Sequence, residues 1–136
     1  MDLKQPALAV DCVVFNEADQ LLLIRRKNEP FQGQYALPGG FVEIGETVEQ
    51  AARRELQEET SVEAADLHLI GVYSDPKRDP RRHVISVSYL ALLTSAVAVA
   101  GDDAATAEFI SDWRSEKLAF DHNTILEDAL RVRAAL

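Results

Sequence analysis

Apolar residues dominate Ala7–Phe15, and this continuous run predicts a buried strand. A polar break at residues 16–20 and a second apolar run at 21–24 predict the return strand of a hairpin. The following segment, 25–33, is polar and contains a proline, so we expect a loop there. The first quarter of the chain therefore favours strands over helices.

Residues 35–42 form a short segment that is interrupted by Pro38-Gly39-Gly40, which predicts a strand with a tight turn and close backbone approach. A helix is predicted over 46–60, because apolar residues then recur at helical spacing. Thr47 and Gln50 have the spacing of a capping box at its start. The residues on the predicted apolar face are Val48, Ala51, Ala52 and Leu56.

The second half of the chain continues this pattern and ends in an amphipathic helix. The predicted elements are strands at 67–74, 84–93 and 108–113, loops at 75–83 and 100–107, and a helix at 121–136. Asp121 would lie near the N-cap of that last helix. This order of elements predicts an α/β fold, with a mixed sheet covered by helices on both faces.

The chain has 136 residues, so we expect a single domain over residues 1–136. Its formal net charge is −9 without an offsetting basic stripe, and neither nucleic acid nor a membrane surface is the expected partner. The start of the chain does not resemble a signal peptide. The single cysteine, Cys12, lies in an apolar run, so we expect a core thiol and a cytoplasmic location.

Three glutamates of the predicted helix, Glu55, Glu58 and Glu59, are spaced so that they share one helical face. Like charges at this spacing repel, and the helix dipole disfavours anions near the C-terminus. One interpretation is a solvated acidic surface, with Arg53 and Arg54 offsetting part of the charge. The other is a hard-cation site, because Mg²⁺ prefers oxygen ligands and commonly bridges carboxylates to substrate phosphates.

Gly40, Glu46 and the segment 54–62 fit one longer pattern: glycine, five residues, glutamate, seven residues, then Arg-Glu-Leu-Gln-Glu-Glu-Thr-Ser-Val. This pattern resembles the signature of the Nudix family at every fixed position except Ser61, where the family has glycine. In the family, Glu46 corresponds to an acidic position that is mainly structural. Because the replaced glycine suits a left-handed helix end, we expect Ser61 to cost roughly 1 kcal/mol and to remove no metal ligand.

The resemblance implies the Nudix fold, an α/β/α sandwich with a mixed central sheet, over nearly the whole chain. By position, the side chains of Glu55, Glu58 and Glu59 resemble the family's metal ligands, as does the carbonyl of Gly39. Arg54 resembles the residue that orients those carboxylates by a salt bridge. The implied cofactor is Mg²⁺, and Mn²⁺ is an alternative because it accepts the same oxygen ligands.

Segments outside the signature, 74–89 and 118–122, resemble small ADP-ribose pyrophosphatases and also the Nudix domains of regulators that sense ADP-ribose. Arginines in the first segment, and two more at the end of the strand predicted at 21–24, are chemically suitable, because a guanidinium group can bind phosphate through two parallel hydrogen bonds. The predicted substrate-binding residues are Arg25, Arg26, Arg78, Arg81 and Arg82. The alternative for this basic stretch is a solvated loop held by Pro76 and Pro80.

The implied reaction is metal-dependent hydrolysis of a diphosphate linkage, with ADP-ribose, a small-molecule nucleotide, giving AMP and ribose 5-phosphate. The general base is open between a glutamate of the signature and an acid of the 100–107 loop, Asp102 or Asp103, with Glu108 as a weaker alternative. Other nucleotide sugars and oxidised nucleoside triphosphates are alternative substrates. A module that binds ADP-ribose without cleaving it is the alternative to an enzyme, and a homodimer is also left open.

Overall fold

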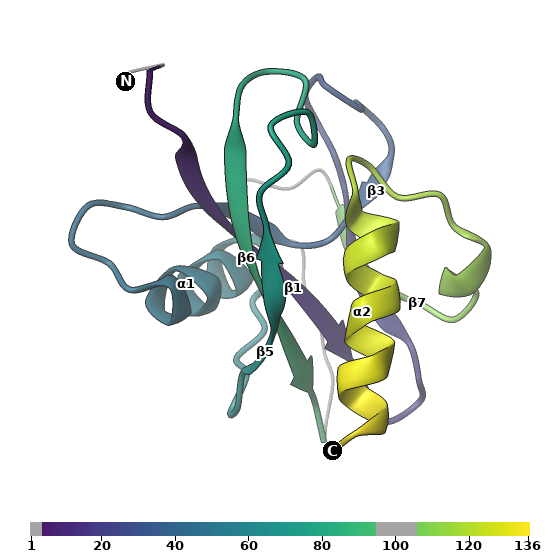
Figure 1. Ribbon diagram of the computed structural model, residues 1–136. Helices are drawn as coiled ribbons and strands as arrows, with labels where there is room; N and C mark the ends of the chain where they lie inside the picture. Colours follow the sequence, from purple (N-terminus) through teal and green to yellow (C-terminus); the bar gives the residue numbers. More distant parts are fainter. Residues whose placement is uncertain (1–3, 95–105) are drawn as a thin grey trace.

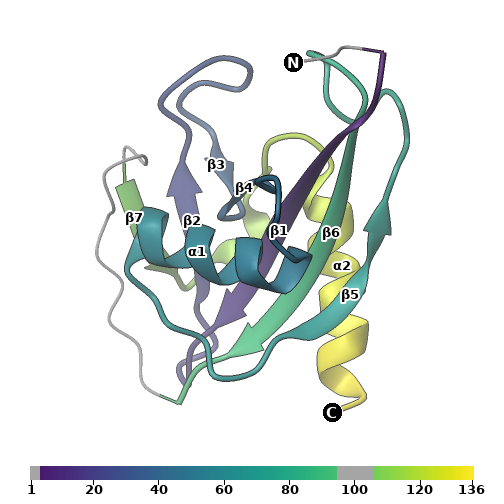
Figure 2. The same cartoon turned by 90° about the vertical axis from the view of Figure 1, so that its left-hand side faces the viewer.

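The computed structural model describes residues 4–94 and 106–136, and the strands within them form one mixed sheet. The elements are β1 (Ala7–Phe15), β2 (Leu21–Arg25), β3 (Tyr35–Ala36), β4 (Gly39–Phe41), α1 (Val48–Thr60), β5 (His68–Tyr73), β6 (Val84–Leu92), β7 (Thr106–Ile110), a 3₁₀ turn (Trp113–Ser115) and α2 (His122–Ala134). The helices α1 and α2 cover opposite faces of the sheet (Figures 1 and 2). The predicted α/β/α sandwich is therefore confirmed.

The sheet is mixed, with strand order β3-β2-β1-β6-β5, while β4 pairs with β1 and β7 pairs with β2. β1 runs parallel to β6 along its whole length and antiparallel to β4. In the β1–β4 pair, Gly39 lies opposite Asp11 and Gly40 lies opposite Val10. This pairing brings the turn predicted around Pro38 next to the centre of β1.

The continuous apolar run of β1 is explained by cores on both of its faces. Val10, Cys12 and Val14 pack in the core on the α1 side, together with Leu56 of that helix. Alternate residues of the same strand pack in the core beneath α2. Cys12 is fully buried, and this burial raises the pKa of its thiol, as expected for a core residue.

The helix α1 has a capping box at its start, with the Thr47 hydroxyl accepting from the Gln50 amide at 3.1 Å. The Gln50 side chain in turn accepts from the Thr47 amide at 2.9 Å. Thr47 is thus the N-cap and the helix begins at Val48, later than the predicted start at residue 46. Residues 43–46 precede it as a turn, in which the Glu46 amide donates to the Glu43 carbonyl.

Ser61 ends α1 in the left-handed conformation, with φ 60° and ψ 18°, as its place in the signature predicted. Ser61→Gly should therefore stabilise the protein by about 1 kcal/mol, because glycine adopts this conformation without a Cβ clash. A rise of about 2–4 °C in Tm would follow for a domain of this size. Ser74→Gly, at an exposed position outside the left-handed region, is the control and should lower Tm or leave it unchanged.

The C-terminal part differs from prediction in its boundaries. The strand predicted at 108–113 is β7, and it begins and ends earlier because Thr106–Ile110 pairs with β2. Trp113 belongs to the 3₁₀ turn, where its indole N–H donates to the Asp19 carbonyl. Asp121 precedes α2 without capping it through its side chain.

Neither α-helix, at 13 residues each, is long enough to cross a membrane, and no other helix in the described ranges is either.

Candidate functional site

The turn between β3 and β4 lies directly against the acidic face of α1. The Gly39 amide donates to Oε1 of Glu59 at 2.8 Å, and Glu59 is only 6% exposed. A Cβ atom on Gly40 would lie 2.5 Å from the carboxyl carbon of Glu55. Two of the three predicted glutamates therefore face the glycine backbone that follows Pro38, and a fully solvated acidic surface is excluded for them.

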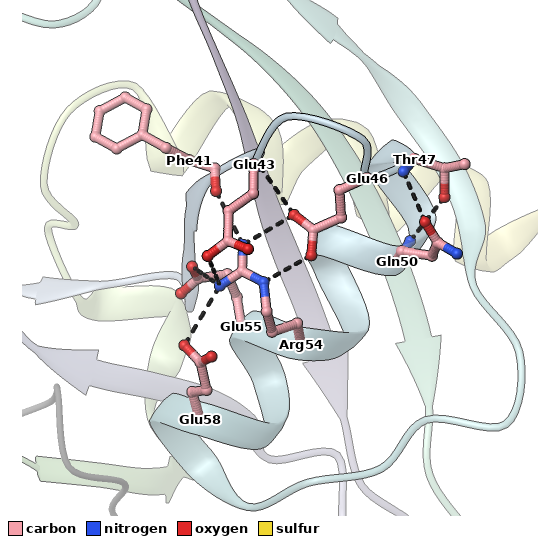
Figure 3. A network of polar contacts seen from close by, with 8 residues as sticks. All are labelled: Phe41, Glu43, Glu46, Thr47, Gln50, Arg54, Glu55 and Glu58. Carbon is pink, nitrogen blue, oxygen red and sulfur yellow. Dashed lines mark hydrogen bonds and ion pairs between the residues drawn. The ribbon is translucent and has the colours of Figure 1, made fainter. Parts of the chain in front are cut away.

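Arg54 lies at the centre of the acidic face and contacts carboxylates on three sides (Figure 3). Its Nε donates to Glu46 at 2.7 Å, and its Nη1 lies 2.8 Å from Glu55 and 3.3 Å from Glu58. Its Nη2 donates to the carbonyl of Phe41. The hydrogen bonds from Arg54 lower the pKa of Glu46 to about 2. Arg54 thus forms ion pairs with three glutamates and offsets part of the charge of the helix face.

The donor atoms beside the turn suit a hard divalent cation, since they are carboxylate oxygens next to backbone that carries no side chains. The three glutamates do not converge on one point: Glu55 and Glu58 contact Arg54, whereas Glu59 contacts Gly39. No group of three His, Cys, Asp or Glu side chains forms a ready-made metal site within residues 4–94 and 106–136. The Glu58 side chain is 45% exposed, so packing does not fix its orientation.

A cavity of about 220 Å³ opens beside this turn. Gly39, Gly40 and Glu59 line one part of it, and Arg26, Arg81 and Phe120 line another. The guanidinium carbon of Arg26 lies 4.9 Å from the centroid of the Phe120 ring, and that of Arg81 lies 5.7 Å from it. Burial and then the positive charge of Arg81 lower the pKa of Arg26. Two neighbouring cations and an aromatic ring therefore face the same space as the glutamate of α1.

The NUDIX domain family matches residues 5–131 of this sequence. The chain belongs to the Nudix family. The match includes the turn, the acidic helix and the cavity, and Nudix hydrolases generally use divalent metal ions. Membership confirms the enzyme class predicted from the signature, a Nudix pyrophosphohydrolase.

Three similar proteins are informative. An ADP-ribose pyrophosphatase of Methanocaldococcus jannaschii is 51% identical over 93% of this chain and 74% of its own length. The ADPR responsive transcriptional repressor NtrR of Acinetobacter baylyi is 32% identical over 94% of this chain, which spans 54% of that repressor. The crystallised NUDIX domain of Shewanella oneidensis NrtR, complexed with ADP ribose, superposes with a TM-score of 0.88, at 31% identity over 98% of this chain and 94% of that domain.

Some of the predicted arginines line the cavity, and the others lie elsewhere. Arg26, Arg78 and Arg81 line the cavity, while Arg25 and Arg82 are not among the described residues around it. Arg25 donates to the Gly33 carbonyl, and Arg82 donates to the Gln5 carbonyl. Whether the cavity arginines contact substrate stays a prediction.

Two of the cavity arginines are already engaged with carboxylates. Arg78 donates to both carboxylate oxygens of Asp121, at 2.8 and 2.7 Å, and thereby holds the 75–83 loop against the start of α2. Arg81 donates from Nε and Nη2 to Asp79, at 3.0 and 2.7 Å. The Arg78 side chain is therefore not freely solvated, whereas Lys77 and Arg81 stay exposed, so the solvated-loop alternative holds for part of this basic stretch.

Several residues around the cavity were not singled out from the sequence. Asp11 and Asp79 are buried acids, and Phe120 adopts a positive φ of 54°. A signal for Asp11 existed, because it is the one charged residue in an otherwise apolar strand. His122, by contrast, was a sequence candidate for orienting substrate or for packing; it is buried, and this burial lowers its pKa. The proposed bases Asp102 and Asp103 lie outside the described residues, and Glu108 accepts from the Tyr35 hydroxyl at 2.7 Å.

Proposed function

We propose that this chain is a Mg²⁺-dependent hydrolase that cleaves ADP-ribose to AMP and ribose 5-phosphate. The main support is its 51% identity, over 93% of its length, to a protein named an ADP-ribose pyrophosphatase. The geometry is compatible, because the cavity joins the acidic turn to the Arg26, Arg81 and Phe120 surface. One substrate can therefore place its diphosphate at the turn and extend into the cavity.

In this mechanism, water attacks one phosphorus atom and the bond from that atom to the bridging oxygen breaks. A bound divalent ion would neutralise phosphate charge and lower the pKa of the attacking water. Glu55 and Glu59 would hold it beside Gly39, and Glu58 would join them by side-chain rotation. Arg54 keeps the carboxylates oriented, while Arg26 and Arg81 contribute positive charge along the cavity. A glutamate of α1 or Asp103 would act as general base.

Incubation with ADP-ribose and MgCl₂ should produce AMP and ribose 5-phosphate in equal amounts, measured by ion-pair chromatography. In a panel with UDP-glucose and 8-oxo-dGTP, ADP-ribose should have the highest kcat/KM, by about 100-fold, because the cavity contacts differ between these substrates. Replacing MgCl₂ by EDTA should abolish turnover, and MnCl₂ should restore it. A higher kcat/KM for the triphosphate would contradict the substrate assignment.

A second candidate function is ADP-ribose binding without cleavage. It is favoured by the 32% identity to an ADPR responsive repressor and by the likeness to an NrtR domain complexed with ADP ribose. Calorimetry with ADP-ribose, followed by chromatography of the same sample, separates the two functions. Binding without AMP formation in the presence of Mg²⁺ or Mn²⁺ would favour the sensor. The single-domain boundary, the homodimer and the cytoplasmic location stay predictions.

A further inference from the structure

A buried polar pair lies behind the turn, on the sheet face that α2 covers. Asp11 is 8% exposed and His122 is 4% exposed, although neighbouring positions of β1 and α2 are apolar core. Buried polar side chains are costly unless hydrogen bonds compensate for lost hydration. Apolar residues could fill this space between β1 and α2 without that cost, so the hydrogen bonds of Asp11 and His122 have to compensate for their burial.

His122 connects the start of α2 to the backbone just before the turn. The Leu37 amide donates to its Nδ1 at 3.0 Å. Because Nδ1 is the acceptor, the neutral ring carries its proton on Nε2, which lies 3.4 Å from Oδ1 of Asp11. The ring therefore bridges the segment that leads into Gly39 and the strand beside it.

Asp11 is fixed from its other side and touches the turn itself. The Ser86 hydroxyl donates to Oδ2 of Asp11 at 2.6 Å, and Nη2 of Arg78 lies 3.7 Å from the same oxygen. A Cβ atom on Gly39 would lie 2.7 Å from Oδ1 of Asp11, so the carboxylate is packed against the bare glycine backbone. The amide of that same glycine donates to Glu59. The turn is thus held between Asp11 and His122 on one side and α1 on the other.

We propose that His122 and Asp11 are positioning residues, which fix the Leu37–Gly40 segment so that Glu59 and Glu55 hold a divalent ion beside it. They act through the turn, and both also line the cavity beside it. This inference rests on the proposed function, because it assigns the ion to that site. It extends the functional machinery from α1 to β1 and the first residue of α2, on the far side of the sheet.

His122→Phe tests the inference, because it keeps a ring in the core and removes both nitrogen contacts. We expect the dissociation constant for Mn²⁺, measured by calorimetry without substrate, to rise about 10–100-fold, as for residues that support metal ligands indirectly. His122→Asn places an oxygen near the position of Nδ1, so it should restore much of the affinity. Ser86→Ala removes one hydrogen bond to Asp11 without altering α2, and it should weaken Mn²⁺ binding in the same direction even if the phenylalanine variant misfolds.

Ile125→Val is the matched control, since Ile125 is a fully buried residue of α2 that packs in the core beneath the sheet. It should lower Tm and leave the Mn²⁺ affinity unchanged. Wild-type affinity in both Ser86→Ala and a folded His122 variant would overturn the positioning role while leaving the proposed function intact. A wild-type protein that binds no Mn²⁺ at all would overturn the proposed function, and this inference with it.

Discussion

Glu59→Gln is expected to reduce kcat for ADP-ribose by more than about 100-fold, because even residues that only support metal ligands are worth 10–100-fold. Glutamine retains a carbonyl oxygen that can accept from the Gly39 amide, so the turn should keep its place. What it loses is the negative charge on a side chain that is only 6% exposed. Steady-state kinetics with saturating MgCl₂ and calorimetry with Mn²⁺ measure the two expected losses.

Glu49→Gln is the matched control, because Glu49 is an exposed residue in the first turn of the same helix. It should leave kcat, KM and Mn²⁺ affinity near wild-type values. Tm should change by little in either variant. Near-normal turnover by a well-folded Glu59→Gln protein would refute the assignment of this carboxylate to the metal site.

The two glycines of the turn should respond very differently to alanine. On Gly39, the added Cβ would overlap the carbonyl oxygen of Val10 and crowd Asp11, and both belong to a central strand that cannot move away. Gly39→Ala should therefore destabilise the protein by about 3 kcal/mol, as overpacking a rigid site does. On Gly40, the added Cβ would meet only the flexible end of Glu55. Gly40→Ala should fold, with Glu55 displaced and kcat strongly reduced.

Urea unfolding measures the loss of stability in Gly39→Ala. Steady-state kinetics and calorimetry with Mn²⁺ measure the loss of activity and of ion binding in Gly40→Ala. Gly71→Ala serves as the control for both, because the nearest atoms to a Cβ there would be those of the Tyr73 side chain, from 3.7 Å, an ordinary contact distance. Its stability and kinetics should stay close to wild type. Equal stability of Gly39→Ala and Gly71→Ala would show that the turn is not packed against β1 as described.

Repulsion between the carboxylates of the acidic helix face is offset by a guanidinium group and a backbone amide that contact them. Arg54 contacts Glu46, Glu55 and Glu58, and the Gly39 amide donates to Glu59. An ion bound at the turn would compete with Arg54 for the Glu55 and Glu58 carboxylates. Binding of such an ion would therefore be coupled to the Arg54 ion pairs.

Local pattern alone determined much of the fold. The apolar run of β1 and the capping box of α1 were predictable, because they depend on side chains a few residues apart. The left-handed end at Ser61 was predictable only from its place in the Nudix signature. The acidic face of α1 was equally predictable, since helical geometry fixes the spacing of its glutamates. The error in β7 arose because pairing with β2, a distant segment, sets its ends.

The arrangement of side chains around the cavity, by contrast, depends on tertiary structure and was not predictable from the sequence. The arginines of the 75–83 loop looked equivalent in sequence, yet Arg78 pairs with Asp121, Arg81 pairs with Asp79, and Arg82 reaches the N-terminal segment. Likewise, His122 reaches the Leu37 amide although the two residues are 85 positions apart. Sequence spacing specifies which residues share a face of one element, whereas the meeting of faces depends on packing between elements. In this protein, the parallel pairing of β1 with β6 and the packing of α2 on the sheet determine which faces meet.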